Sequence, residues 1–111
     1  LVFCHPRYTS SAQQRILDSG GLLLSEQPFG VKASPMRVVA RNRLQAARST
    51  TVILAQCPEQ SGSMHTMRFA RRYRKKCLAV QCPKATDANG GNRVRIAEGF
   101  AEPIPFASLR A

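Results

Sequence analysis

The stretch that decides the fold reads ARNRL at residues 40–44, TVILA at residues 51–55 and PEQSGS at residues 58–63. Its apolar, β-branched middle predicts a buried strand, preceded by a basic helix and followed by a small-residue loop that opens a second helix. In an open α/β sheet, ligands bind just beyond the carboxyl ends of the strands. A loop of small residues at a helix start would there offer backbone N–H groups to an anion, and the arginines would add positive charge. The stretch therefore predicts a phosphate-binding edge on a Rossmann-like sheet.

The charge of the chain is strongly one-sided for 111 residues, the length of a single domain. Lys and Arg number 17 against 6 Asp and Glu, which gives a formal net charge of +11. Such an excess favours a polyanionic partner, in particular nucleic acid. The alternative is a solubilising basic surface, and the cation-rich run at residues 71–76 is open to that interpretation.

The cysteines form no C-x-x-C pair; they are Cys4, Cys57, Cys77 and Cys82. This pattern favours free thiols in a reducing, cytoplasmic setting over a disulfide framework or a zinc knuckle. Cys4, His5 and the distant His65 lack the spacing of metal ligands, so we expect no metal. No apolar run reaches 18 residues, which predicts no membrane span, and residues 1–4 are too short for a signal-peptide core. Because the chain opens on strand-like residues without Met, we expect a further N-terminal portion.

Short apolar runs alternate with helix-like segments along the chain. The runs predict strands at residues 1–4, 22–25, 50–56, 77–81 and 101–104. The last of these is expected at a sheet edge, because prolines cannot donate ladder hydrogen bonds. The other segments predict helices from residue 10 or 11 to 19, and at residues 37–48, 62–76 and 92–98. This alternation predicts one doubly wound, mostly parallel sheet with helices on both faces, a three-layer α/β/α Rossmann-like domain.

Two helices should turn apolar residues inward. Ile16 and Leu17 would face the core from the first helix. Met67, Ala70 and Tyr73 recur at three-residue spacing and would face the sheet from the third.

Five motifs, in the same order over residues 1–104, resemble those of one known family. They are LLSEQP at 23–28, RNRL at 41–44 with Ala46, Ala47 and Ser49, EQSGSM at 59–64 with Thr66 and Ala70, AVQCP at 79–83, and GN at 91–92 with Ile96, Glu98 and Gly99. These are similar to the L-[IL]-S-E-[YF]-P, R-N-R-[IL]-I-A-G-L-S, E-x-S-G-[ST]-x-x-T-x-x-x-A, A-V-P-G and G-x-N-x-L-I-x-x-G-A patterns of the DNA-processing protein A family (DprA, also called Smf). By these motifs the chain is identified as a member of that family.

The resemblance implies a Rossmann-like domain that binds single-stranded DNA and hands it to a RecA-type recombinase during natural transformation. It implies a homodimer, no catalysis and no cofactor. The implied DNA and phosphate contacts are Arg41, Asn42, Arg43, Ser61, Gly62 and Ser63, with Lys32 and Arg37 as nearby cations.

Several family features are replaced or missing. The family's G-S-R loop and S-G-x-A-x-G-[IV]-D segment have no counterpart, so residues 1–111 resemble only the second half of its Rossmann-like domain. Val38 stands where the family has a base-stacking Phe, and Pro35 where it has a basic residue. Cys82-Pro83 replaces the glycine of A-V-P-G. We therefore expect DNA affinity to depend on charge more than on stacking, and to fall steeply with salt.

Two other functions compete with this one. Related proteins of the cytokinin-activating type bind or cleave nucleoside phosphates and carry P-G-G-x-G-T-x-x-E where this chain has residues 58–66, but the helix at 62–76 has no Glu and offers only His65 as an acid–base group. A degenerate or truncated gene product that folds only with another chain or as a tight dimer is the third interpretation. The loop at 61–63 could equally be an ordinary helix cap, and Arg41 and Arg43 a solvated helix face.

Overall fold

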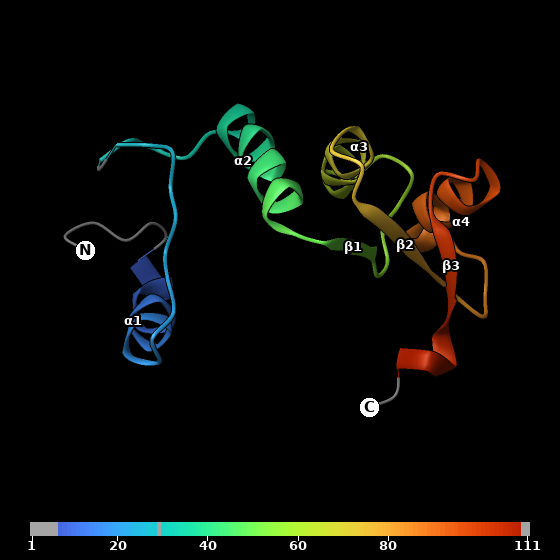
Figure 1. Cartoon of the computed structure of the whole chain (residues 1–111), viewed down its shortest axis with the longest axis horizontal. Coiled ribbons are helices and arrows are strands. Elements are labelled where there is room, and N and C mark those ends of the chain that lie inside the picture. The colour runs from blue at the N-terminus through green and yellow to red at the C-terminus, as the bar shows by residue number, and fades with distance from the viewer. Residues whose placement is uncertain (1–6, 29, 110–111) are drawn as a thin grey trace. The chain divides into compact units, whose positions relative to one another are not determined.

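The computed structural model describes residues 7–28 and 30–109, drawn as ribbon in Figure 1. The chain divides into two compact units, Leu1–Val38 and Val39–Ala111. The order of elements is η1 (Arg7–Thr9), α1 (Ser10–Asp18), α2 (Pro35–Arg48), β1 (Thr51–Leu54), α3 (Ser63–Arg72), β2 (Lys76–Gln81), η2 (Asp87–Asn89), α4 (Gly90–Ala97), β3 (Glu102–Pro105) and η3 (Phe106–Leu109).

The first unit contains α1, which confirms the helix predicted from residue 10. It ends in a Schellman motif: Gly20 has a φ of +80°, and the N–H groups of Gly20 and Gly21 bond the carbonyls of Leu17 and Ile16. The inward orientation predicted for Ile16 and Leu17 is wrong, because these side chains are 42% and 40% exposed. The described part of this unit holds no sheet for them to pack on.

The strand predicted at residues 22–25 is also absent from the described structure. Leu22 and Leu24 are 77% and 65% exposed, and these residues pair with no described strand. A strand exists only through its ladder hydrogen bonds, so apolar composition alone does not make one. The strand predicted at residues 1–4 lies outside the described residues.

The second unit holds a parallel sheet with the strand order β1-β2-β3. This is a pair of consecutive βαβ units, and it confirms an α/β, Rossmann-like fold. Of the predicted strands, three pair in the described part of the chain. β3 is an edge strand, as its prolines predicted.

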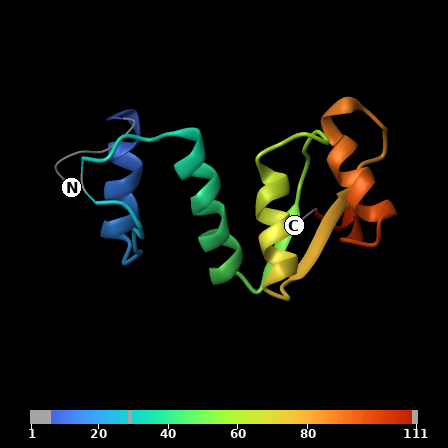
Figure 2. The same cartoon turned by 90° about the horizontal axis from the view of Figure 1, so that it is seen from above.

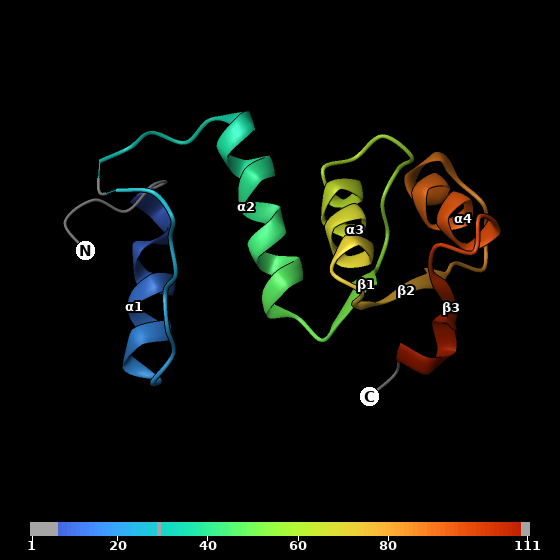
Figure 3. The same ribbon diagram turned by 45° about the horizontal axis from the view of Figure 1, so that its top comes forward.

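The core lies between the sheet and its helices. Leu54 pairs in register with Ala79, and both are buried against Met67 and Ala70 of α3. Ile96 of α4 packs on the same cluster, so α3 and α4 cover one face of the sheet, which Figure 2 and Figure 3 show from two sides. Continuous apolar strands between short crossover helices position the loops at the carboxyl edge.

The predicted orientation of Tyr73 is wrong, because the side chain is 37% exposed and stacks on Phe69 with ring centroids 6.1 Å apart. The predicted helix at 62–76 ends at Arg72, and Tyr73 is already its capping residue. Arg74 follows with a φ of +57°, so the helical spacing used in the prediction no longer applies there.

Candidate nucleic-acid interface

The carboxyl edge of the sheet is organised by one buried side chain, Asn92 in the first turn of α4. Its amide nitrogen lies 3.0 Å from the carbonyl oxygens of Leu54, Ala55 and Val80, and its Oδ1 accepts from the Cys57 N–H at 3.0 Å. The residue is 1% exposed. Asn92 therefore ties the ends of β1 and β2 to the loop that follows β1.

Gly91 explains why a small residue precedes Asn92. Its N–H donates to the Cys57 carbonyl at 3.0 Å, so α4 begins directly against the loop. A Cβ at this position would lie 2.6 Å from Cys57 Sγ and 2.7 Å from the Pro58 carbonyl oxygen. Only glycine permits this approach without a shift of the loop backbone.

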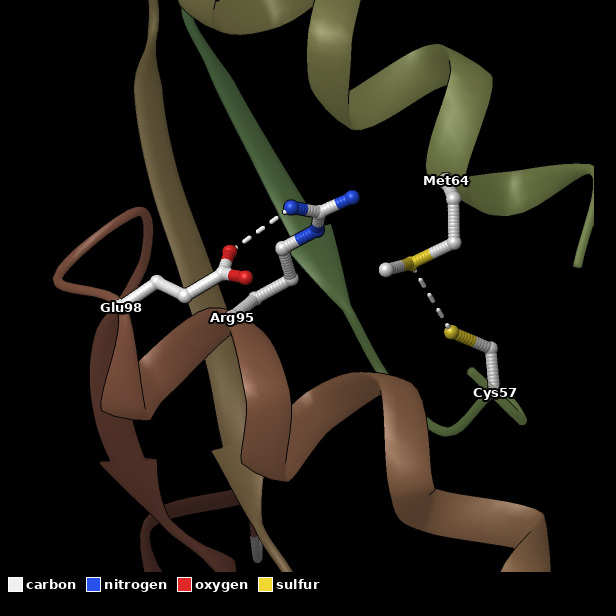
Figure 4. Close-up of polar contacts among 4 residues, drawn as sticks. All are labelled: Cys57, Met64, Arg95 and Glu98. Atoms are coloured by element: carbon white, nitrogen blue, oxygen red, sulfur yellow. Dashed lines mark hydrogen bonds and ion pairs between the residues drawn. The ribbon is translucent and has the colours of Figure 1, made fainter. Parts of the chain in front are cut away.

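The underside of the same loop is apolar. Cys57 is 2% exposed and its sulfur lies 3.6 Å from Met64 Sδ, as Figure 4 shows. Burial raises the pKa of the Cys57 thiol, and the positive charge of Arg95 opposes that shift. Arg95 itself pairs with Glu98 at 2.8 Å in the same view. Cys57 is thus a free thiol that fills the core as a small apolar side chain.

The basic helix and the small-residue loop meet through Asn42. Its side chain is 8% exposed, and its Nδ2 donates to the Gly62 carbonyl at 3.3 Å. This bond turns Asn42 inward, with exposed Arg41 before it and half-buried Arg43 after it. The spacing R-N-R therefore fixes the helix against the loop by its middle residue and leaves a cation on either side.

The backbone at the start of α3 is largely engaged within the loop. Ser61 Oγ accepts from the Ser63 N–H at 3.3 Å, and the Ser61 carbonyl accepts from the Met64 N–H at 3.0 Å. The His65 N–H donates to Gly62 at 3.1 Å. The expectation of free N–H groups does not hold for Ser63, Met64 and His65, because each of them donates within the loop. An anion that bound the Ser63 N–H would have to displace the Ser61 hydroxyl.

A shallow hollow of about 350 Å³ opens beside this loop. Its lining residues include Glu59, Gln60, Ser61, Gly62, His65 and Arg68. Its lining combines the cationic side chain of Arg68 and the hydroxyl of Ser61 with the carboxylate of Glu59. The nucleoside-phosphate interpretation requires a glutamate on α3, and that helix carries no acidic residue.

Lys32 and Arg37 lie in the first unit, and their contacts are given within that unit. Arg37 Nη1 donates to the Lys32 carbonyl at 2.8 Å, and the Arg37 N–H lies 3.3 Å from Ser34 Oγ. Val38, in the position of the family's stacking Phe, is 42% exposed. The structure therefore brings Asn42 together with the 61–63 loop, and Lys32 with Arg37.

Two structural residues of this edge, Gly91 and Asn92, were absent from the predicted site. Their only signal in the sequence was the family-like GN pair.

Within residues 7–28 and 30–109, no His, Cys, Asp and Glu side chains gather in a group that could hold a metal ion. None of the helices described combines the length and the apolar composition of a membrane span.

Comparisons with known proteins support the α/β, Rossmann-like fold and the family of the chain. Residues 1–108 match the family model for DNA recombination-mediator protein A. The chain is similar to protein Smf of Synechocystis sp. (32% identity over 71 residues, 63% of this chain and 18% of that protein) and to protein Smf of Escherichia coli (28% over 95 residues, 86% and 25%). It is also similar to a solved structure of DNA processing protein A from Helicobacter pylori, studied for its single-stranded DNA binding mode (TM-score 0.78, 31% identity, 92% of this chain and 46% of that chain). The chain thus spans a quarter or less of these curated relatives and about half of the solved one.

Proposed function

This chain belongs to the DNA recombination-mediator protein A family, and from that premise we propose that it binds single-stranded DNA at the carboxyl edge of its sheet. The observation that carries the proposal is the bond from Asn42 to Gly62, which joins the arginine-bearing helix to the small-residue loop. The similar chain from H. pylori was studied for its single-stranded DNA binding mode.

Binding would be electrostatic for the most part. Arg41 and Arg43 would form charge-assisted hydrogen bonds to phosphates, and the Ser61 and Ser63 hydroxyls would complete the contact. Each neutralised phosphate releases condensed counterions, so affinity would fall with salt at about 0.7 log units per contact and per log unit of salt. With Val38 in place of an aromatic residue, the stacking energy of about 1–3 kcal/mol per base is absent at that position.

The finer parts of the proposal follow from family membership. The chain would act as a binding protein without catalysis or a cofactor, in the cytoplasm. It would present its strand to a RecA-type recombinase during natural transformation, and it would work as a homodimer.

The test measures the affinity for a labelled single-stranded oligonucleotide against NaCl concentration. We expect Arg41→Ala/Arg43→Ala to weaken binding and to reduce the salt slope by about 1.4, twice the value for one contact. The control is Arg15→Ala/Arg48→Ala, which removes one exposed arginine from α1 and one from the last turn of α2 and has the same net charge as Arg41→Ala/Arg43→Ala. Equal loss in both double variants, or equal binding of duplex and single strands, would leave only a diffuse basic surface.

A further inference from the structure

A second basic site lies at the opposite end of the sheet, where α3 ends and β2 begins. There the lining of a hollow of about 340 Å³ includes four cations, one aromatic ring and one carboxylate: Arg71, Arg74, Lys75, Lys76, Phe100 and Glu102. Because the strands are parallel, this amino edge lies away from the loop at residues 61–63. We call it the basic hollow.

The backbone at Arg74 is unusual for an arginine. α1, α3 and α4 each end in a Schellman motif, with Gly20, Arg74 and Gly99 at the left-handed position. For Arg74, the N–H groups of Arg74 and Lys75 bond the carbonyls of Arg71 and Ala70 at 3.0 and 2.8 Å. A side chain in this conformation is disfavoured, and two of the three equivalent positions are glycine. The chain thus keeps a cation at a point where its own folding favours glycine.

Phe100 holds the guanidinium of Arg71 at the rim of the basic hollow. The Cζ atoms of Arg71 and Arg95 lie 4.6 and 4.7 Å from the centre of the Phe100 ring. Cation–π contacts of this length orient a guanidinium without consuming its N–H donors. Arg71 is therefore positioned to donate to an anion. Phe100 serves as its support.

A stripe of exposed cations connects the two ends. Arg68 lines the hollow beside Ser61, Arg71 and Arg72 follow it by one turn, and Arg74 comes next. No acidic residue occurs in α3, so nothing on the helix neutralises the stripe. Like charges at this spacing disfavour an isolated helix, which a bound polyanion would reverse. The helix has 10 residues and spans about 15 Å, the length of about four stacked nucleotides.

We propose that a single strand bound at the carboxyl edge continues along α3 and places a phosphate in the basic hollow, held by Arg71 and Arg74. This inference rests on the proposed function and adds a second anchor to it. Glu102 is the opposing charge at this site; its carboxylate pairs with Lys76 at 4.0 Å, and both side chains are largely exposed. A phosphate would compete with Glu102 for that lysine.

The experiment compares oligonucleotides of about two and about twenty nucleotides, because two stacked nucleotides cover about 7 Å and only the longer strand can span α3 from the loop to the basic hollow. We expect Arg74→Gly to weaken binding of the longer strand about three- to tenfold at low salt and to lower its salt slope by about 0.7. Binding of the short strand should not change. Since glycine suits the backbone at this position, the variant should fold at least as well as the original chain.

Three further variants separate the explanations. Arg74→Lys keeps the charge and should bind both strands like the original chain, whereas Glu102→Gln should tighten binding of the longer strand only. Arg15→Ala removes one charge elsewhere and should have a smaller effect. Equal loss of both strands in Arg74→Gly, or no loss beyond that of Arg15→Ala, would overturn the second anchor. Failure of the first site is recognised separately, because Arg41→Ala/Arg43→Ala would then leave binding of the short strand unchanged.

Discussion

Replacing Asn92 by alanine should destabilise the second unit more than any other single amide removal at this edge. The side chain contacts four backbone groups, each at 3.0 Å, from the ends of β1 and β2 and from the loop that follows β1. The amide has two hydrogens for three carbonyls, so three hydrogen bonds is the fair count. At about 1 kcal/mol each, these bonds account for about 3 kcal/mol. Leaving the Cys57 N–H without an acceptor adds about 1 kcal/mol or more, which gives a total near 4 kcal/mol.

The assay is urea unfolding of the full chain followed by circular dichroism, with the free energy of unfolding taken from the midpoint and slope. Asn42→Ala is the matched control: it also truncates a buried asparagine, but it removes a single bond of 3.3 Å and should cost about 1 kcal/mol. A loss below about 1 kcal/mol in Asn92→Ala, or equal losses in the two variants, would refute the role assigned to Asn92, since one hydrogen bond is worth that much.

Three further outcomes are expected. Gly91→Ala should lower the free energy of unfolding by about 1–3 kcal/mol in the same assay, because its Cβ would meet Cys57 Sγ and the loop carbonyls. Arg74→Gly should raise it by about 1 kcal/mol, since the left-handed backbone suits glycine; a lower melting temperature would contradict this. Burial raises the pKa values of the Cys57 and Cys77 thiols above the ordinary 9.0. Alkylation followed by peptide mapping should therefore label Cys82 before either of them. The stability that these two buried thiols contribute is complete below pH 9 and should fall as the pH rises above it.

The sequence was most informative where local pattern and topology act together. A parallel α/β order places the ends of β1 and β2 at one edge, so the closeness of the R-N-R helix to the 61–63 loop could be predicted without coordinates. The strand predicted at residues 22–25 failed because pairing depends on a neighbouring strand, which composition does not report. The predicted orientation of Tyr73 was wrong because α3 ends just before it. The left-handed position that closes a helix is usually glycine, so the arginine at residue 74 gave no sign of the helix end.

Asn92 shows a different limit of sequence reasoning. Asparagine is common in turns and caps, so nothing in its immediate surroundings distinguishes a loop residue from a buried clamp. Its role depends on three backbone segments that come together only in the folded chain, at separations of up to 38 residues. The family-like GN pair was visible, but its reason lies in the close approach of Gly91 to Cys57.

Asn42, Gly91 and Asn92 all form hydrogen bonds with the loop that follows β1. Asn42 holds the carbonyl of Gly62 at one end of that loop, while Gly91 and Asn92 hold the backbone of Cys57 at the other. All three use groups that point inward, which leaves the outer surface of the loop to a ligand. A loop fixed at both ends loses little conformational freedom when a phosphate binds. If the proposed site binds phosphate, that saving in entropy would offset part of the contact energy lost with the family's stacking aromatic, and Asn42, Gly91 and Asn92 would then contribute to affinity as well as to stability.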